Sequence, residues 1–218
     1  MKYLAIDTSG NYLAVTAGKD GRTFCSCVPD CAMKHSVTLM GEVEKVLNDA
    51  EFTLAECDFF AAVVGAGSFT GIRIGISAAK GFALACGKPT LAITSFDALA
   101  YNVLDKVFGG EERKTLCLID AMHGHYYACG YLGKKIIVEP AFLTETEVLQ
   151  YANDGFTLVS GTEISLGEIV AVVVDPVAGL AAAVEDKSQN PENFGELTAL
   201  YIRKSSAEIN LENGFKVH

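Results

Sequence analysis

The sequence has 218 residues, of which 50% are hydrophobic and 20% are charged, and its formal net charge is −10. Such a chain forms one large globular domain or two small lobes around a substantial core. The sequence argues against a membrane-spanning protein, because no apolar run approaches the roughly 20 residues that span a bilayer. It also argues against a protein that binds nucleic acid by itself, because an acidic chain repels a phosphate backbone unless a partner supplies a basic surface.

Residues Met1-Lys2-Tyr3 lead directly into an expected strand and carry none of the features of a signal sequence. We therefore expect a cytoplasmic location, where cysteines stay reduced. Four of the cysteines fall in apolar segments that are typical of buried free thiols: Cys57, Cys86, Cys117 and Cys129. The others, Cys25, Cys27 and Cys31, lack the Cys-x-x-Cys spacing of a zinc site. We predict neither a metal nor a cofactor.

The first half of the chain predicts alternating strands and helices. Short apolar runs between turns rich in Gly, Asn and Asp are typical of hairpins. The expected elements are strands over 3–8, 12–17 and 23–28, a helix over 34–50, a strand over 59–64, a helix over 70–86, a strand over 90–93 and a helix over 95–107. In the first helix, apolar residues at three- and four-residue spacing predict one apolar face: Val37, Met40, Val43, Val46 and Leu47.

Residues 108–113 are rich in glycine and charge, and the order of elements then repeats. The expected elements are strands over 114–120, 125–131 and 136–142, a helix over 144–153, strands over 156–160 and 169–174, and a helix over 177–184. This duplication predicts an N-terminal, partner-binding lobe over 1–107 and a C-terminal lobe over 108–218, whose last segment is able to pack back on the first lobe. Two such α/β lobes match the ribonuclease H-like fold of actin, sugar kinases and chaperone ATPases.

The most distinctive segment is the glycine-rich loop from Gly65 to Gly75. A loop of this kind, between a buried strand and a helix, can present backbone N–H groups to an anion or to a protein partner. It lacks the Gly-Lys-Ser/Thr of a P-loop and the glycine spacing of a dinucleotide site. The alternative is a tight turn whose glycines allow the strand and the helix to pack closely.

In ATPases of this fold the first hairpin of each lobe grips nucleotide phosphates, with an aspartate at the end of its first strand. The equivalent residues here are Asp7 and Asp120. The first hairpin continues with Thr8 and Ser9 and stays polar, whereas the second, 120–124, carries bulky residues that are expected to block close backbone approach. We predict a vestigial phosphate site at Asp7, Thr8, Ser9 and Asp120. An ATP-binding kinase or ATPase is the alternative function.

Short motifs are spread over essentially the whole chain: Leu4-Ala5-Ile6-Asp7-Thr8-Ser9, His35-Ser36, Gly-Ser-Phe-Thr-Gly-Ile-Arg at 67–73, Ile93-Thr94-Ser95, Ile119-Asp120-Ala121 and Tyr201-Ile202-Arg203-Lys204. In these motifs the chain resembles the bacterial TsaB family, which acts in making threonylcarbamoyladenosine in tRNA. Two positions depart from the family pattern. Ala66 stands where proline is usual, and Met122-His123 replace paired arginines, which removes positive charge from the second hairpin.

The resemblance implies a non-catalytic subunit. In the family, TsaB pairs with the related catalytic subunit TsaD, the ATPase TsaE joins the pair, and tRNA is reached only through the complex. Alone, TsaB forms a homodimer through the same surface, which is built from the first two helices. The residues that the resemblance places in this surface are His35, Leu39, Val43, Phe69, Ile72, Ile76, Ala79 and Lys80. A charge at Ile76 or Ala79 is expected to abolish association and to leave the fold intact.

Two features of the second helix keep alternatives open. Its many small residues fit either a protein partner or close packing on the sheet. Arg73 could hold a carboxylate or phosphate through two hydrogen bonds, or it could form an ion pair between the lobes.

A metal-dependent active site of the peptidase or TsaD type is not expected. Such a site needs two histidines one helical turn apart, and His35 has Leu39 at that spacing. His123 and His125 lack a third ligand with clear spacing and are expected to be hairpin residues.

Overall fold

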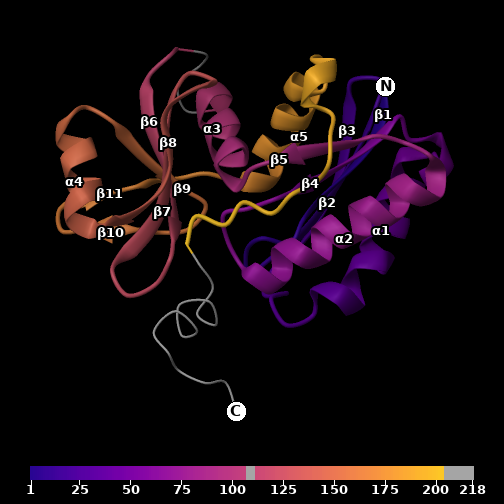
Figure 1. Ribbon diagram of the computed structural model, residues 1–218, viewed down its shortest axis with the longest axis horizontal. Coiled ribbons are helices and arrows are strands. Elements are labelled where there is room, and N and C mark those ends of the chain that lie inside the picture. The colour runs from indigo at the N-terminus through magenta and orange to yellow at the C-terminus, as the bar shows by residue number, and fades with distance from the viewer. Residues whose placement is uncertain (107–110, 204–218) are drawn as a thin grey trace.

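The computed structural model describes residues 1–106 and 111–203 and contains two five-stranded sheets (Figure 1). The first sheet has the order β3-β2-β1-β4-β5. Its strands are β1 (Lys2–Asp7), β2 (Leu13–Lys19), β3 (Arg22–Val28), β4 (Phe59–Val63) and β5 (Thr90–Ile93). Strands β1, β2 and β3 pair antiparallel, whereas β1, β4 and β5 pair in parallel. The predicted boundary between the lobes, at 107 and 108, lies outside the described residues.

The second sheet repeats this topology, with the order β12-β9-β6-β7-β8. Its strands are β6 (Lys114–Asp120), β7 (His125–Leu132), β8 (Lys135–Thr144), β9 (Thr157–Ser160) and β12 (Val172–Val173). Here β6, β7 and β8 pair antiparallel, and β6, β9 and β12 pair in parallel. Each strand occupies the place of its counterpart in the first sheet, which confirms the predicted duplication of an α/β lobe.

The two lobes differ after their fourth strand. Helix α2 (Phe69–Cys86) connects β4 to β5, whereas a small hairpin of β10 (Ser165–Leu166) and β11 (Ile169–Val170) connects β9 to β12. The predicted strand over 169–174 is therefore wrong in its extent. At Ala171 the backbone N–H donates to the carbonyl of Ile164, and beyond it the chain pairs with β9 instead of β10.

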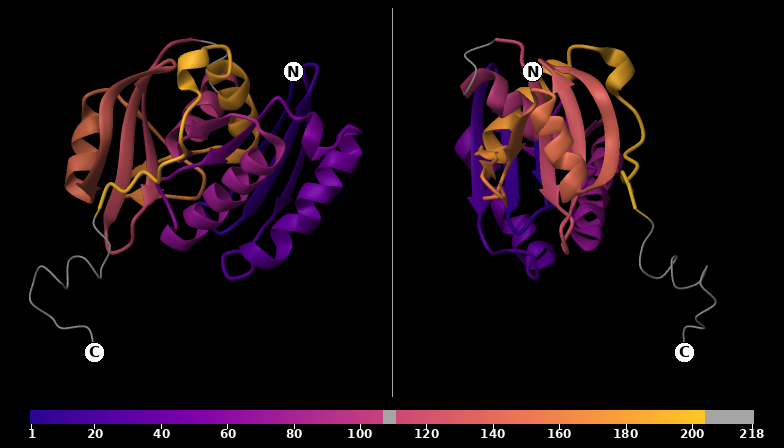
Figure 2. Two further views of the ribbon diagram at one scale, coloured as in Figure 1. Left: turned by 45° about the vertical axis from the view of Figure 1, so that its right-hand side comes forward. Right: turned by 90° about the vertical axis from the view of Figure 1, so that its left-hand side faces the viewer.

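The helices lie in layers against the sheets (Figures 1 and 2). Helices α1 (His35–Ala50) and α2 cover one face of the first sheet, and α4 (Glu145–Asn153) covers the outer face of the second. Helices α3 (Ser95–Lys106) and α5 (Pro176–Lys187) pack together between the two sheets. Short 3-10 helices span Leu54–Glu56 and Pro191–Asn193. None of the helices over 1–106 and 111–203 combines the length and the hydropathy that a membrane-spanning helix needs.

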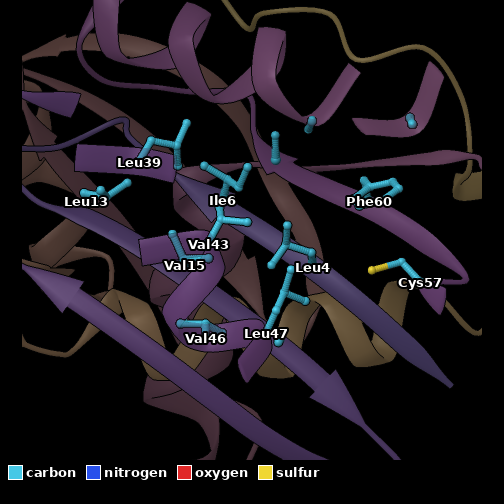
Figure 3. Packing of buried hydrophobic residues seen from close by; sticks show 14 of the residues in the cluster. Leu4, Ile6, Leu13, Val15, Leu39, Val43, Val46, Leu47, Cys57 and Phe60 are labelled. Carbon is cyan, nitrogen blue, oxygen red and sulfur yellow. The ribbon is translucent and has the colours of Figure 1, made fainter. Parts of the chain in front are cut away.

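The first sheet is apolar on both faces because helices cover both of them. Along β1, successive side chains point to opposite sides. Leu4 and Ile6 pack beneath α1, where they meet Leu39 and Val43 (Figure 3). Tyr3, on the other face, packs in the core formed with α3 and α5. This arrangement explains why β1 and β4 read as nearly unbroken apolar runs in the sequence.

An extended segment, residues 194–203, follows the last short helix and runs toward the second lobe (yellow in Figure 1). We call it the C-terminal strap. Phe194 forms a β-bridge with Leu91 of β5, and Leu197 is buried in the core that contains α1 and α2. The N–H of Leu200 donates to the carbonyl of Val64 at 2.8 Å. The strap therefore covers part of the edge of the first sheet and contacts the chain just before α2.

The lobes are joined where α3 crosses α5. Gly179 of α5 lies so close to α3 that a Cβ there would collide with the carbonyl oxygen of Ala98. Near the end of α5, Lys187 Nζ lies 2.6 Å from Oδ2 of Asp97, whose side chain is only 2% exposed. Oδ1 of Asp97 accepts a hydrogen bond from the Tyr131 hydroxyl on β7 at 3.1 Å. The buried carboxylate of Asp97 thus connects α3 to α5 and to β7, which links the two lobes.

Candidate functional site

The glycine-rich loop packs directly on the first hairpin. A Cβ at Gly67 would collide with the carbonyl oxygen of Ser9, and a Cβ at Gly71 would collide with that of Thr8. Ser68 N–H donates to the Ser9 carbonyl at 2.7 Å, and Thr8 Oγ1 donates to the Gly71 carbonyl at 2.7 Å. These groups are used within the chain, so the glycines serve close packing. Of the two roles predicted for the loop, this geometry favours the tight turn over the anion site.

The carboxylate of Asp7, at the end of β1, is enclosed by the same hairpin and is 1% exposed. Oδ1 accepts hydrogen bonds from the N–H and the hydroxyl of Ser9 at 2.8 and 2.6 Å, and Oδ2 accepts one from the Tyr12 hydroxyl at 2.6 Å. Burial, and then the charge of Asp7, raise the pKa of Tyr12 well above its ordinary value, so its hydroxyl stays a donor. A phosphate would have to displace these hydrogen bonds to reach Asp7 or Ser9.

A cleft of about 240 Å³ lies between the lobes. Its walls come from the first hairpin, the glycine-rich loop, α3, the ends of β6 and β9, and the start of α5. It is lined by Ser9, Gly10, Asn11, Tyr12, Cys27, Ala66, Ser95, Leu99, Leu118, Ile119, Asp120, Ser160, Gly161, Thr162, Asp175, Pro176 and Val177. Of the four predicted phosphate-binding residues, the structure therefore brings Ser9 and Asp120 to the cleft. Asp7 and Thr8 lie behind its wall.

The cleft is acidic. Asp120 accepts a hydrogen bond from the N–H of Met122 at 2.8 Å, and Asp175, which caps α5, accepts one from the N–H of Val177 at 2.9 Å. The described residues that line the cleft include no Lys, Arg or His. Cations or free N–H groups are what hold phosphates in proteins, so this lining suits ATP poorly. Desolvation, and then Asp175, raise the pKa of Cys27, whose thiol is thus not activated as a nucleophile.

The turn of the second hairpin lies outside the cleft. Met122 and His123 have left-handed backbones, with φ of 68° and 57°, and neither residue lines the cleft. That their bulk blocks the close approach of a backbone to a phosphate stays a prediction. His125 stacks on Phe142 with ring centroids 4.8 Å apart, as expected of a hairpin residue. In the part of the chain that the structure describes, no three His, Cys, Asp or Glu side chains gather closely enough to hold a metal ion.

Most of the residues predicted for a partner surface are buried in the core instead: His35, Leu39, Val43, Ile72, Ile76 and Ala79. The reason is that α1 and α2 turn these sides toward the first sheet. A charge at Ile76 or Ala79 would enter this core, so the expectation that it leaves the fold intact is wrong. Phe69 and Lys80 do reach the surface, where Lys80 pairs with Glu196 at 2.8 Å.

The outward sides of α1 and α2 expose apolar and small side chains. Val37, Met40 and Leu84 are 84%, 54% and 86% exposed. We define the helical surface as the following residues: Met33, Val37, Met40, Gly41, Thr70, Arg73, Ser77, Gly81, Leu84 and Ala85. The prediction of a single apolar face on α1 did not separate the exposed Val37 and Met40 from the buried residues. At 3.6 residues per turn, Val37 lies roughly half a turn around the helix from Val46, and this offset is visible in the sequence.

Arg73, in the second turn of α2, lies against the ring of Phe69 and close to that of Tyr201. Its guanidinium carbon lies 3.7 Å from the ring centroid of Phe69 and 5.8 Å from that of Tyr201. Its Nε donates to the Tyr201 hydroxyl at 2.9 Å, and the two rings stack with centroids 5.0 Å apart. Arg73 thus connects α2 to the C-terminal strap. Among residues 1–106 and 111–203 Arg73 forms no ion pair between the lobes, which was one of the two roles considered for it.

Known proteins match over most of the chain. The sequence profile of the TsaD family, described as tRNA N6-adenosine threonylcarbamoyltransferase, matches residues 25–209. A Bacillus subtilis protein named tRNA threonylcarbamoyladenosine biosynthesis protein TsaB is 26% identical over 215 residues, which cover 96% of this chain and 90% of that protein. An uncharacterised Mycobacterium leprae protein is 32% identical over 216 residues, which cover 94% of this chain and 55% of that protein. The chain thus spans about half the length of the second relative.

A solved structure agrees on the fold. A Pseudomonas aeruginosa protein, described as similar to the peptidase YeaZ, superimposes with a TM-score of 0.73 at 21% identity and covers 93% of this chain and 99% of that one. With the order of strands in the two sheets, this similarity shows the two-lobed, actin-like fold. On its match to the family profile and to the B. subtilis relative, the chain belongs to the TsaD family and, within it, to the TsaB proteins.

Proposed function

We propose that this chain is a non-catalytic accessory subunit in the formation of threonylcarbamoyladenosine in tRNA. In this function it binds a TsaD-like catalytic subunit and, with it, a TsaE-like ATPase in the cytoplasm, and it reaches tRNA only through that complex. Without its partner, two copies associate through the same surface. The name of the B. subtilis relative supports the pathway.

The observation that carries the proposal is the helical surface. Val37, Met40 and Leu84 are largely exposed on neighbouring helices, although each would contribute roughly 1.5 to 3 kcal/mol if it were buried. Large apolar side chains left exposed on adjoining helices are what a protein interaction site offers. Gly41 and Gly81, also exposed, leave room for another helix to pack against α1 and α2.

The cleft supports the absence of catalysis in this chain. Its carboxylates, Asp120 and Asp175, face no cation among the described lining residues, and the counterpart of Asp120 in the first lobe, Asp7, is enclosed by hydrogen bonds. The phosphates of a nucleoside triphosphate in this cleft would meet these carboxylates, although phosphates need positive charge around them. The helical surface, on the other side of the first sheet, is independent of the cleft.

The proposal is tested by placing a charge on the helical surface. We expect Val37→Arg and Leu84→Arg to abolish co-elution with a TsaD-like subunit in size-exclusion chromatography, because each would bury an unpaired charge in the complex. Both positions are exposed, so the free energy of unfolding should change by less than about 0.5 kcal/mol. The matched control is Val170→Arg, since Val170 is 59% exposed on the hairpin of the second lobe. It should co-elute like the wild type.

Two results would count against the proposal. The first is co-elution that is unchanged in both helical variants. The second is tight binding of ATP and magnesium to the isolated chain in calorimetry, followed by turnover, which would favour the kinase or ATPase alternative.

A further inference from the structure

Helix α2 presents one charged residue among the small and apolar residues of its exposed stripe. The structure describes the whole of α2, and the exposed residues that follow one another at three- and four-residue spacing are Thr70, Arg73, Ser77, Gly81 and Leu84. A helical partner that covers Gly81 and Leu84 therefore also lies next to Arg73. The guanidinium must then stay at the rim in water or meet an acceptor on the partner, because a buried charge without a partner is strongly unfavourable.

The guanidinium of Arg73 is held in place before any partner arrives. The ring of Phe69 lies against its face at 3.7 Å, and Tyr201 accepts the hydrogen bond from Nε at 2.9 Å. Tyr201 is itself positioned by the strap, since the preceding residue, Leu200, pairs with the backbone of Val64. A side chain that is already ordered loses less conformational entropy when it binds.

The remaining donors of Arg73 are available. An arginine has five N–H donors, of which the structure uses the one on Nε. Among residues 1–106 and 111–203, neither Nη atom has a hydrogen-bond partner. With Nε fixed on Tyr201, the two Nη groups form the free edge of the planar fork, which matches the two oxygens of a carboxylate.

We infer that Arg73, together with Phe69 and Tyr201, forms a receptor for an Asp or Glu carboxylate on the catalytic partner. This inference rests on the proposed function and adds a specific contact to it. A protein carboxylate fits better than a phosphate backbone for two reasons. The rest of the stripe is apolar or small, as at a protein interface, and the net charge of −10 repels nucleic acid.

The test compares affinities for a TsaD-like subunit by calorimetry at two salt concentrations. We expect Arg73→Gln to weaken binding by at least about 30-fold, because truncating one member of a buried charge pair costs about 2 kcal/mol or more. Arg73→Lys keeps the charge without the fork and should recover only part of this loss. Tyr201→Phe removes only the hydroxyl that orients Nε, and we expect about a two- to five-fold loss.

The matched control is Arg22→Gln. Arg22 is an exposed arginine on β3 whose guanidinium carbon lies 5.2 Å from the ring centroid of Phe24, far from α2 in the sequence and on a different element. The affinity of Arg22→Gln for the TsaD-like subunit should stay within about two-fold of that of the wild type, as for most residues that are not binding hot spots. The salt dependence of binding should also be steeper for the wild type than for Arg73→Gln, because salt screens an ion pair.

The outcomes separate the inference from the function on which it rests. If the wild type binds and Arg73→Gln binds with the same affinity and the same salt dependence, the carboxylate receptor is wrong and the proposed function stands. If Arg73→Lys binds as tightly as the wild type, the fork is not what the partner recognises. If the wild type does not bind the TsaD-like subunit at all, the proposed function fails and the inference fails with it.

Discussion

The two lobes have the same order of strands but differ in what connects the fourth strand to the fifth. In the first lobe this connection is the long helix α2, which lies beside α1 and completes the helical surface. In the second lobe it is the short hairpin of β10 and β11, and over the described residues no other helix lies beside α4 on its face of the sheet. Among the described residues the duplicated unit therefore provides a broad surface of two helices once, in the first lobe, and this is the surface that the proposed function uses.

The first hairpins of the lobes differ as much as the connections do. Asp7 is enclosed and holds Ser9 and Tyr12, whereas its counterpart Asp120 is exposed and accepts one hydrogen bond within its own turn. An aspartate at the same place in the fold thus has a different role in each lobe. In the first lobe it organises the hairpin and, through it, the glycine-rich loop. In the second lobe it contributes charge to the cleft.

The largest effect on stability is expected where the two lobes of the chain meet. Ala98 and Gly179 are each the fourth residue of their helices, and they face each other where α3 crosses α5. Gly179→Val would force these helices apart, and we expect it to lower the free energy of unfolding by about 3 kcal/mol, the upper end of the range for overpacking. Urea denaturation followed by circular dichroism measures this loss.

The control for this substitution is Gly81→Ala. A Cβ at Gly81 has open space around it, and the residue is exposed within α2. Alanine there should stabilise the protein by roughly 0.5 to 1 kcal/mol, because glycine is the poorer helix former. If Gly179→Val were tolerated as well as Gly81→Ala, α3 and α5 would not form the close contact that joins the lobes.

The next prediction compares the two hairpins directly. Asp7→Ala would leave the hydroxyl of Tyr12 and the N–H of Ser9 without their acceptor in a buried place, and we expect a loss of about 2 to 3 kcal/mol. Asp120→Ala removes an exposed carboxylate from one turn, and we expect a loss of about 0.5 kcal/mol or less. Thermal unfolding of both variants decides the matter, and equal losses would remove the distinction between the hairpins.

The sequence predicts the elements and the duplication because these depend on local patterns. The segment from Phe59 to Val63 is a short unbroken apolar run, as expected of a strand covered on both faces, and α2 begins within one residue of its predicted start. The order of the elements then repeats in the second half, which is enough to predict two related lobes. The split of the strand expected over 169–174 escapes this reasoning, since β11 and β12 are defined by different partner strands. The short strand β10 and the two 3-10 helices were not predicted either.

The details of the candidate site depend on contacts between distant residues, and the sequence shows these poorly. The strap has no periodic pattern, although Leu197 is 1% exposed and Tyr201 reaches Arg73 across the chain. Hydroxyls at a turn usually bond within it, as Ser9 does with Asp7, but the sequence does not show that the hydroxyl of Thr8 reaches the carbonyl of Gly71. Which side of α1 faces outward could have been predicted from the offset of Val37, because helical geometry fixes it.

The smallest expected effect is electrostatic and concerns two equivalent caps, one in each lobe. Thr53 with Glu56, and Thr144 with Glu147, form the same capping box at a helix start. The hydrogen bond from Lys2, and then those from Thr53, lower the pKa of Glu56 to about 2. The backbone and hydroxyl of Thr144 lower the pKa of Glu147 without help from a lysine. NMR titration of the glutamate carboxyls should therefore find Glu56 the more acidic of the two.

The sign of the resulting pH dependence follows from these shifts. A carboxylate whose pKa is lowered by folding stabilises the protein fully above its ordinary pKa and loses this contribution as the pH falls through the folded value. For Glu56 the loss extends from the ordinary glutamate range down to about pH 2, whereas for Glu147 it is complete at a higher pH. Lys2→Met should raise the pKa of Glu56 toward that of Glu147 and leave Glu147 unchanged. If Glu56 keeps its low pKa in this variant, the cap alone sets it, and the two lobes do not differ here.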